Sequence, residues 1–112
     1  MATLNWTTVD SDGSLFSKGK RDYYAIVVHG IPKDHPKDCI IELYIADKEM
    51  TLSDIKYNAR HEQIKLLSRQ IVLGNLSTVT DIYKTIEEMK NTAEKEENAN
   101  PYSSLSSAYS LK

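Results

Sequence analysis

"RDYYAIVVHG", residues 21–30, contains an uninterrupted run of aromatic and aliphatic residues from Tyr24 to Val28. The run is short and is bounded by charged residues and a glycine, which is typical of a strand buried on both faces of a sheet. We therefore predict a central strand over 21–30, with the rest of the fold built around it.

Two further segments extend the sheet on either side of this strand. "CIIELYIAD" (39–47) is a second strong strand, with Ile41, Leu43 and Ile45 on one face. "TLNWTTV" (3–9) has β-branched and aromatic residues in rough alternation and predicts another. The two prolines and the charges of "IPKDHPKD" predict an exposed loop. Three consecutive strands with such connections indicate an antiparallel β-meander.

The apolar period changes after residue 50, which predicts helices in the second half. The first helix is expected to start at Thr51 or Ser53, with "TLSD" as a capping box, or near Ala59, and to end before Gly74. Its apolar positions are Ile55, Ala59, Ile64, Leu67 and Ile71.

The segment that follows permits two interpretations. A helical stripe of Val79, Ile82, Ile86 and Met89 favours a helix from Ser77. Alternatively, the β-branched "LSTVT" forms a short strand over 76–80, and the helix starts after Asp81.

These elements predict an α+β or α/β fold with one domain over 1–97. It is a three-stranded antiparallel meander followed by two helices, with or without a fourth short strand between them. Residues 98–112 are Ser-rich and contain a proline, so we expect a flexible tail there.

Composition limits the classes of function. The chain has 112 residues, of which 40% are hydrophobic and 27% charged, as in a globular protein. Its net charge of -2 argues against a large positively charged surface that binds nucleic-acid phosphates. Cys39 is the single cysteine, so we expect a buried, inert thiol and no internal disulfide. The chain shows neither a signal-peptide pattern nor an apolar run of about 20 residues, so we expect an intracellular, cytoplasmic protein without a membrane span.

Three short motifs occur in an order that resembles the ribonuclease H family. "VDSDGS" (9–14) is similar to the Asp-Gly-Ser that ends the family's first strand. "NARHE" (58–62) is similar to the Asn-x-Arg-x-Glu pattern of its first helix, and "VTD" (79–81) to the end of its fourth strand. The resemblance implies a β-β-β-α-β-α order and metal-dependent hydrolysis of RNA or an RNA/DNA hybrid.

The resemblance also implies the residues of the site. Asp12, Glu62 and Asp81 would be catalytic ligands of Mg²⁺ or Mn²⁺, with Asp10 as the substitute for Asp12 at the first position. Carboxylate oxygens suit such ions, and a pair of them can activate water for in-line attack on phosphorus. Asn58 would lie near the substrate strand.

Each motif also has a simpler interpretation. Asp-Gly after a strand is a hairpin-turn signal. Glu62 and Asp81 are also ordinary charges of a helix surface and a helix start. The family's fifth strand and fourth ligand have no counterpart here, which allows a degenerate, non-catalytic relative. The second candidate function is a small non-enzymatic protein-binding module, such as an inhibitor of host machinery from a phage or mobile element, and a homo-oligomer is a third possibility.

Overall fold

The structure is a computed structural model that describes residues 4–29, 38–58, 63–74 and 78–99. These residues form seven elements, namely β1 (Thr7–Thr8), β2 (Leu15–Lys18), β3 (Tyr23–His29), β4 (Cys39–Ala46), α1 (Leu52–Asn58), β5 (Ile64–Val72) and α2 (Thr78–Ala99). The strands form one antiparallel sheet in the order β1-β2-β3-β4-β5. The fold class is therefore α+β.

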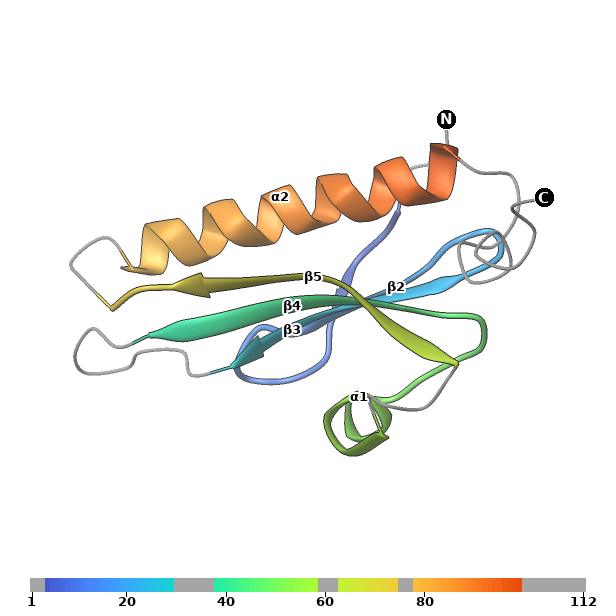
Figure 1. The fold of residues 1–112 in the computed structure, drawn as a ribbon, viewed down its shortest axis with the longest axis horizontal. Coiled ribbons are helices and arrows are strands. Elements are labelled where there is room, and N and C mark those ends of the chain that lie inside the picture. Colours follow the sequence, from blue (N-terminus) through green and yellow to red (C-terminus); the bar gives the residue numbers. More distant parts are fainter. Residues whose placement is uncertain (1–3, 30–37, 59–62, 75–77, 100–112) are drawn as a thin grey trace.

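Figure 1 shows the sheet nearly edge-on, with α2 across one face and α1 against the other. Tyr24, Ile26 and Val28 of β3 point to the α2 face, where they join a core that includes Met89 and Ala93. The alternate β3 residues Ala25 and Val27 point to the α1 face and pack in a second cluster with Ile55. β3 is buried on both faces, as the apolar run predicts.

The helices form where local signals and packing agree. Thr51 and Asp54 make the predicted capping box: the Thr51 backbone N–H donates to Asp54 Oδ2 at 2.7 Å, and the Asp54 N–H donates to Thr51 Oγ1 at 3.1 Å. α2 buries Ile82, Ile86 and Met89, at helical spacing, against the sheet. Neither helix of the described residues is long and apolar enough to cross a bilayer.

The strand count corrects the three-stranded prediction. β2 has only four residues, too few for its alternation to stand out, and it forms by pairing with β3 from Leu15↔Ile26 to Lys18↔Tyr23. β1 is limited to Thr7–Thr8, because it pairs only with Leu15 and Phe16.

The predicted long helix up to Ile71 is wrong in its second part. α1 ends at Asn58, and β5 (Ile64–Val72) pairs along its length with β4. The register moves from Leu43↔Ser68 to Tyr44↔Leu66, so Leu67 is an extra, bulged residue. The bulge interrupts the alternation of side chains between the two faces of the sheet. As a result, Ile64, Leu67 and Ile71 are spaced three and four residues apart, as on one face of a helix.

The boundaries of α2 decide between the strand and the helix predicted around residues 76–81. Thr78, Val79 and Thr80 are helical, so the strand predicted over 76–80 does not form at these three residues, and among the described residues α2 begins at Thr78. The helix continues to Ala99, two residues into the predicted tail. The remaining tail residues, most of the proline loop and Glu62 lie outside the described residues.

The element order carries one strand more than the ribonuclease H resemblance implies. It reads β-β-β-β-α-β-α, and the additional strand, β2, directly follows "VDSDGS". β5 lies beside β4, at the end of a continuous meander.

Candidate functional site

Asp10 organises the turn between β1 and β2. Its Oδ1 accepts hydrogen bonds from the backbone N–H groups of Asp12 and Ser14, both at 3.0 Å. Gly13 has a φ of 91°, a conformation that glycine adopts without strain. The "DSDGS" stretch is thus a hairpin turn stabilised by an aspartate side chain, which is the simpler of the two interpretations.

The other predicted ligands come from separate parts of the fold. Asp81 lies in the first turn of α2, where a negative charge complements the helix dipole. Asn58 is the last residue of α1, and Glu62 lies outside the described residues. In the part of the chain that the structure describes, no three His, Cys, Asp or Glu side chains form a group that could hold a metal ion.

Asp12 instead borders a hollow beside α2. The hollow has a volume of about 370 Å³, and its lining includes Leu15 from β2 together with Val79 and Tyr83 from the helix. Its surface is largely apolar, and Glu87 and Lys90 of α2 also line it.

A charged cluster that the sequence analysis did not identify lies on the α1 face of the sheet. Glu42 Oε1 lies 2.9 Å from His29 Nε2, and Glu42 Oε2 accepts a hydrogen bond from Arg69 Nε at 2.8 Å and forms an ion pair with Arg69 Nη2 at 2.7 Å. The three residues come from β3, β4 and β5. The sheet brings them together because Glu42 is the register partner of Arg69 and lies next to His29 on the same face.

The Glu42 carboxylate is held in its ionised form. Burial of the side chain, which is only 8% exposed, raises the pKa of Glu42, but hydrogen bonds from Arg69, His29 and Tyr44 outweigh this and lower it. Burial, and then the negative charge of Glu42, raise the pKa of Tyr44 to about 12. At neutral pH the cluster therefore combines a carboxylate with a neutral phenol and a guanidinium.

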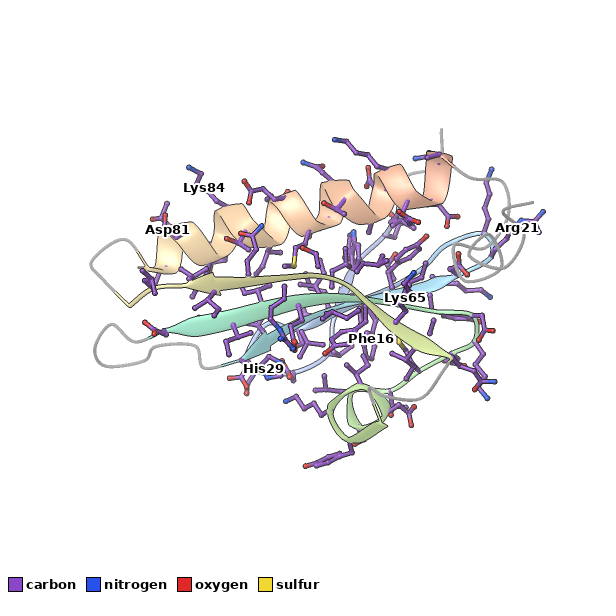
Figure 2. The ribbon with its side chains drawn as sticks, viewed as in Figure 1. Phe16, Arg21, His29, Lys65, Asp81 and Lys84 are labelled. Atoms are coloured by element: carbon purple, nitrogen blue, oxygen red, sulfur yellow. The ribbon has the colours of Figure 1, made fainter. Side chains whose placement is uncertain are left out.

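The cluster forms one side of a pocket of about 370 Å³. The opposite wall is the last turn of α1, with Ile55, Lys56 and Tyr57. In Figure 2, His29 and Phe16 lie on the α1 side of the sheet, whereas Lys65 of β5 lies on the α2 side. We refer to this space between β3–β5 and the end of α1 as the Arg69 pocket.

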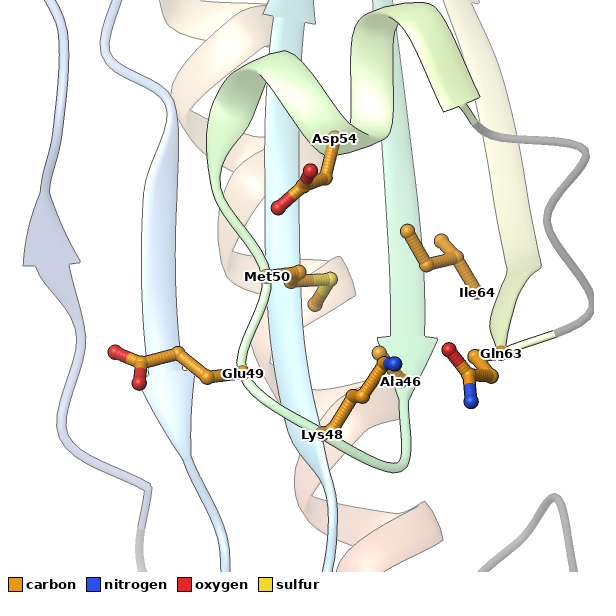
Figure 3. A pocket seen from close by; sticks show the side chains of 7 residues that line it. All are labelled: Ala46, Lys48, Glu49, Met50, Asp54, Gln63 and Ile64. Carbon is orange, nitrogen blue, oxygen red and sulfur yellow. The ribbon is translucent and has the colours of Figure 1, made fainter.

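A second pocket lies at the start of α1. Figure 3 shows its lining, with Asp54 of α1, Met50 of the preceding connection, Ile64 at the start of β5 and Gln63 directly before it. The pocket has a volume of about 330 Å³. Ala46, Lys48 and Glu49 complete its lining. This pocket and the Arg69 pocket therefore both adjoin β5.

β5 forms one edge of the sheet among the described residues. It has nine residues, whereas β1 at the opposite edge has two. Ile71 is 59% exposed, and Leu73, directly after the strand, is 64% exposed. Exposed apolar side chains beside an unpaired strand edge mark a place where another chain can bind.

One signal in the sequence points to the charged cluster. Glu42 is the single charged residue of "CIIELYIA" (39–46), and a carboxylate in a buried strand needs a cationic partner. The sequence does not identify the partners of Glu42. Arg69 falls in the segment that we expect to be helical, so nothing in the sequence places it beside Glu42.

Comparison of the chain with models of protein families, with curated proteins and with solved structures found no match.

Proposed function

We propose that the protein is a non-enzymatic binding module that takes up an extended segment of a partner protein along the edge of β5. The single observation that carries this proposal is the nine-residue β5, which pairs with β4 on one side and with no described strand on the other. Addition of a strand to a sheet edge is a recurrent mode of peptide recognition, in which backbone hydrogen bonds supply affinity and side-chain pockets supply specificity.

The side chains of β5 support this assignment. Leu66 is 38% exposed and Ile71 59%, and both lie on the α1 face, as partners of Tyr44 and Ile40. Ile40 is itself 38% exposed, so Ile40 and Ile71 form an apolar pair beside the Arg69 pocket. A side chain of a partner strand opposite Ile71 would cover the exposed surface of Ile71.

The competing hypothesis is the ribonuclease H-like hydrolase with Mg²⁺ or Mn²⁺ and an RNA or RNA/DNA substrate. It rests on the three motifs, and the engagement of Asp10 in its own turn weighs against that residue as a ligand. The binding module is therefore the function we favour, with a cytoplasmic location in keeping with the free, buried Cys39 thiol.

Site-specific photo-cross-linking in the native host cell tests the proposal. One variant carries the photoreactive residue at Gln70 of β5 and a control variant carries it at Lys84, which is exposed on α2. We expect a defined protein adduct from position 70 only, and loss of that adduct when Ile71 is also changed to Lys. Equal adducts from both positions, or an adduct unaffected by Ile71→Lys, would contradict the role of β5.

A nuclease assay tests the competing hypothesis on the same preparation. The substrates are single-stranded RNA and an RNA/DNA hybrid, with Mg²⁺ or Mn²⁺, and Glu62→Gln is the matched variant. We expect no difference between the wild type and the variant. Metal-dependent cleavage that is lost in Glu62→Gln would overturn the non-enzymatic assignment.

A further inference from the structure

The Arg69 pocket has more hydrogen-bond donors than acceptors. Both oxygens of Glu42 already accept hydrogen bonds, whereas Arg69 has five N–H donors, directs only its Nε and Nη2 atoms to Glu42 and is 56% exposed. Lys56, on the opposite wall, is exposed and forms no ion pair with any described residue. The group that complements this pocket is an acceptor with a negative charge.

β5 places this pocket next to any strand that adds to its edge. In an antiparallel pair, directly opposite residues point to the same face, with Cβ atoms about 4.5 to 5.5 Å apart. The residue opposite Arg69 would therefore lie on the α1 face beside the guanidinium. The residue opposite Ile71, two positions away on the same face, would lie beside an exposed apolar side chain.

The charge of β5 favours an acidic partner over a second copy of the chain. β5 contains two basic residues, Lys65 and Arg69, and no acidic residue. Pairing of two β5 strands would bring two Lys65 and two Arg69 side chains to one seam, where Glu42 compensates only the Arg69 charges, and like charges in neighbouring strands are destabilising.

We infer that the strand bound by β5 carries an Asp or Glu side chain opposite Arg69, seated in the Arg69 pocket, and an apolar side chain opposite Ile71. For an antiparallel partner this is the sequence pattern apolar-x-acid. The inference rests on the proposed strand addition and adds the chemistry of the partner to it.

The experiment begins with selection of random peptides displayed on phage against the purified full-length protein. A selected peptide is then synthesised with its acid and with the matching amide, Asp→Asn or Glu→Gln. Binding is measured by fluorescence anisotropy and located by amide chemical shifts. We expect apolar-x-acid peptides to be enriched, and the amide peptide to bind at least about tenfold more weakly, the usual loss for a charge-assisted hydrogen bond.

Two protein variants with a matched control locate the effect. Lys56→Gln and Arg69→Gln should each weaken the acidic peptide and leave the amide peptide unchanged. Lys65→Gln removes the same charge from the same strand on the other face, and we expect a much smaller loss. Lys56 is exposed at the end of α1, so Lys56→Gln should not disturb the fold. It therefore tests the pocket even if Arg69→Gln perturbs the packing around Glu42.

The outcomes separate the two proposals. One outcome is a peptide that changes the chemical shifts of the β5 backbone amides and binds equally well with its acid and with the matching Asn or Gln. This result would overturn the acidic pattern and leave strand addition intact. If no selected peptide shifts β5, or if the protein sediments as a dimer paired through β5, strand addition by a partner fails and the acidic pattern fails with it.

Discussion

Glu97 is the residue that fixes the end of α2 to the sheet. Its carboxylate accepts hydrogen bonds from the Lys20 backbone N–H and from the Tyr24 hydroxyl, the latter at 3.0 Å. A Cβ at position 19 would come too close to the Glu97 carboxylate in its present position, so a larger residue there would force this side chain to move away from its hydrogen bonds. A charged residue near the end of a helix thus closes the β2–β3 turn.

We therefore expect Glu97→Ala and Gly19→Ala each to lower the free energy of unfolding by about 1 to 2 kcal/mol, because each disturbs charge-assisted hydrogen bonds. Urea denaturation measures both, with Glu88→Ala, at an exposed position of the same helix, as the control. The double variant should lose less than the sum of the single variants, since both act on one contact. Strict additivity would show that Gly19 is needed for another reason.

Glu42 gives the stability a pH dependence of known sign. Its pKa is lowered in the folded state from the ordinary value of 4.5, so the ionised form stabilises the fold. This contribution is fully present above 4.5 and is lost as the pH falls through the lower, folded-state pKa. We expect the wild type to lose more stability than Glu42→Gln between about pH 6 and about pH 3, as measured by urea denaturation. Parallel curves for the two proteins would contradict the ion pair.

At the scale of elements, the sequence predicts the centre of the sheet better than its edges. β3 and β4 carry long apolar runs because both of their faces are buried, and both strands lie where we predict them. β2 and β5 are each exposed on part of their length, so pairing with a neighbour decides their conformation more than local pattern does. The bulge at Leu67 also interrupts the two-residue alternation of apolar and polar side chains by which β5 could have been predicted as a strand.

The same difference between centre and edge predicts amide exchange rates. Ala25, Ile26, Val27 and Val28 of β3 have no exposed surface, so their amides should exchange only on global unfolding. β5 amides that point away from β4 should exchange much faster. Hydrogen exchange followed by NMR measures both sets, and a bound peptide should slow the β5 amides. Equal protection of β3 and outward β5 amides in the free protein would mean that the β5 edge is already covered.

At the scale of the whole molecule, the sequence identifies residues that could form a site but does not show which of them lie close together in space. Motifs in a chain have only a linear order, whereas His29, Glu42 and Arg69 meet because three strands pair in one register. Arg69 could not be assigned to the cluster without knowing that 64–72 is a strand. Conversely, Asp12 and Asp81 keep the order of a known motif set while lying in a hairpin turn and in a helix start.

The placement of these carboxylates predicts a weak response to metal ions. Asp10 is engaged by two backbone N–H groups, and Asp12 and Asp81 belong to a turn and a helix rather than to neighbouring strand ends. We expect Mg²⁺ or Mn²⁺ at about 10 mM to leave the melting temperature unchanged, since only a ligand bound to the folded state raises it. Amide spectra with diamagnetic Mg²⁺ should show no shifts gathered at 10–14 and 81. Shifts at these residues that vanish in Glu62→Gln would show that the carboxylates meet, and would move the nuclease hypothesis ahead of the binding module.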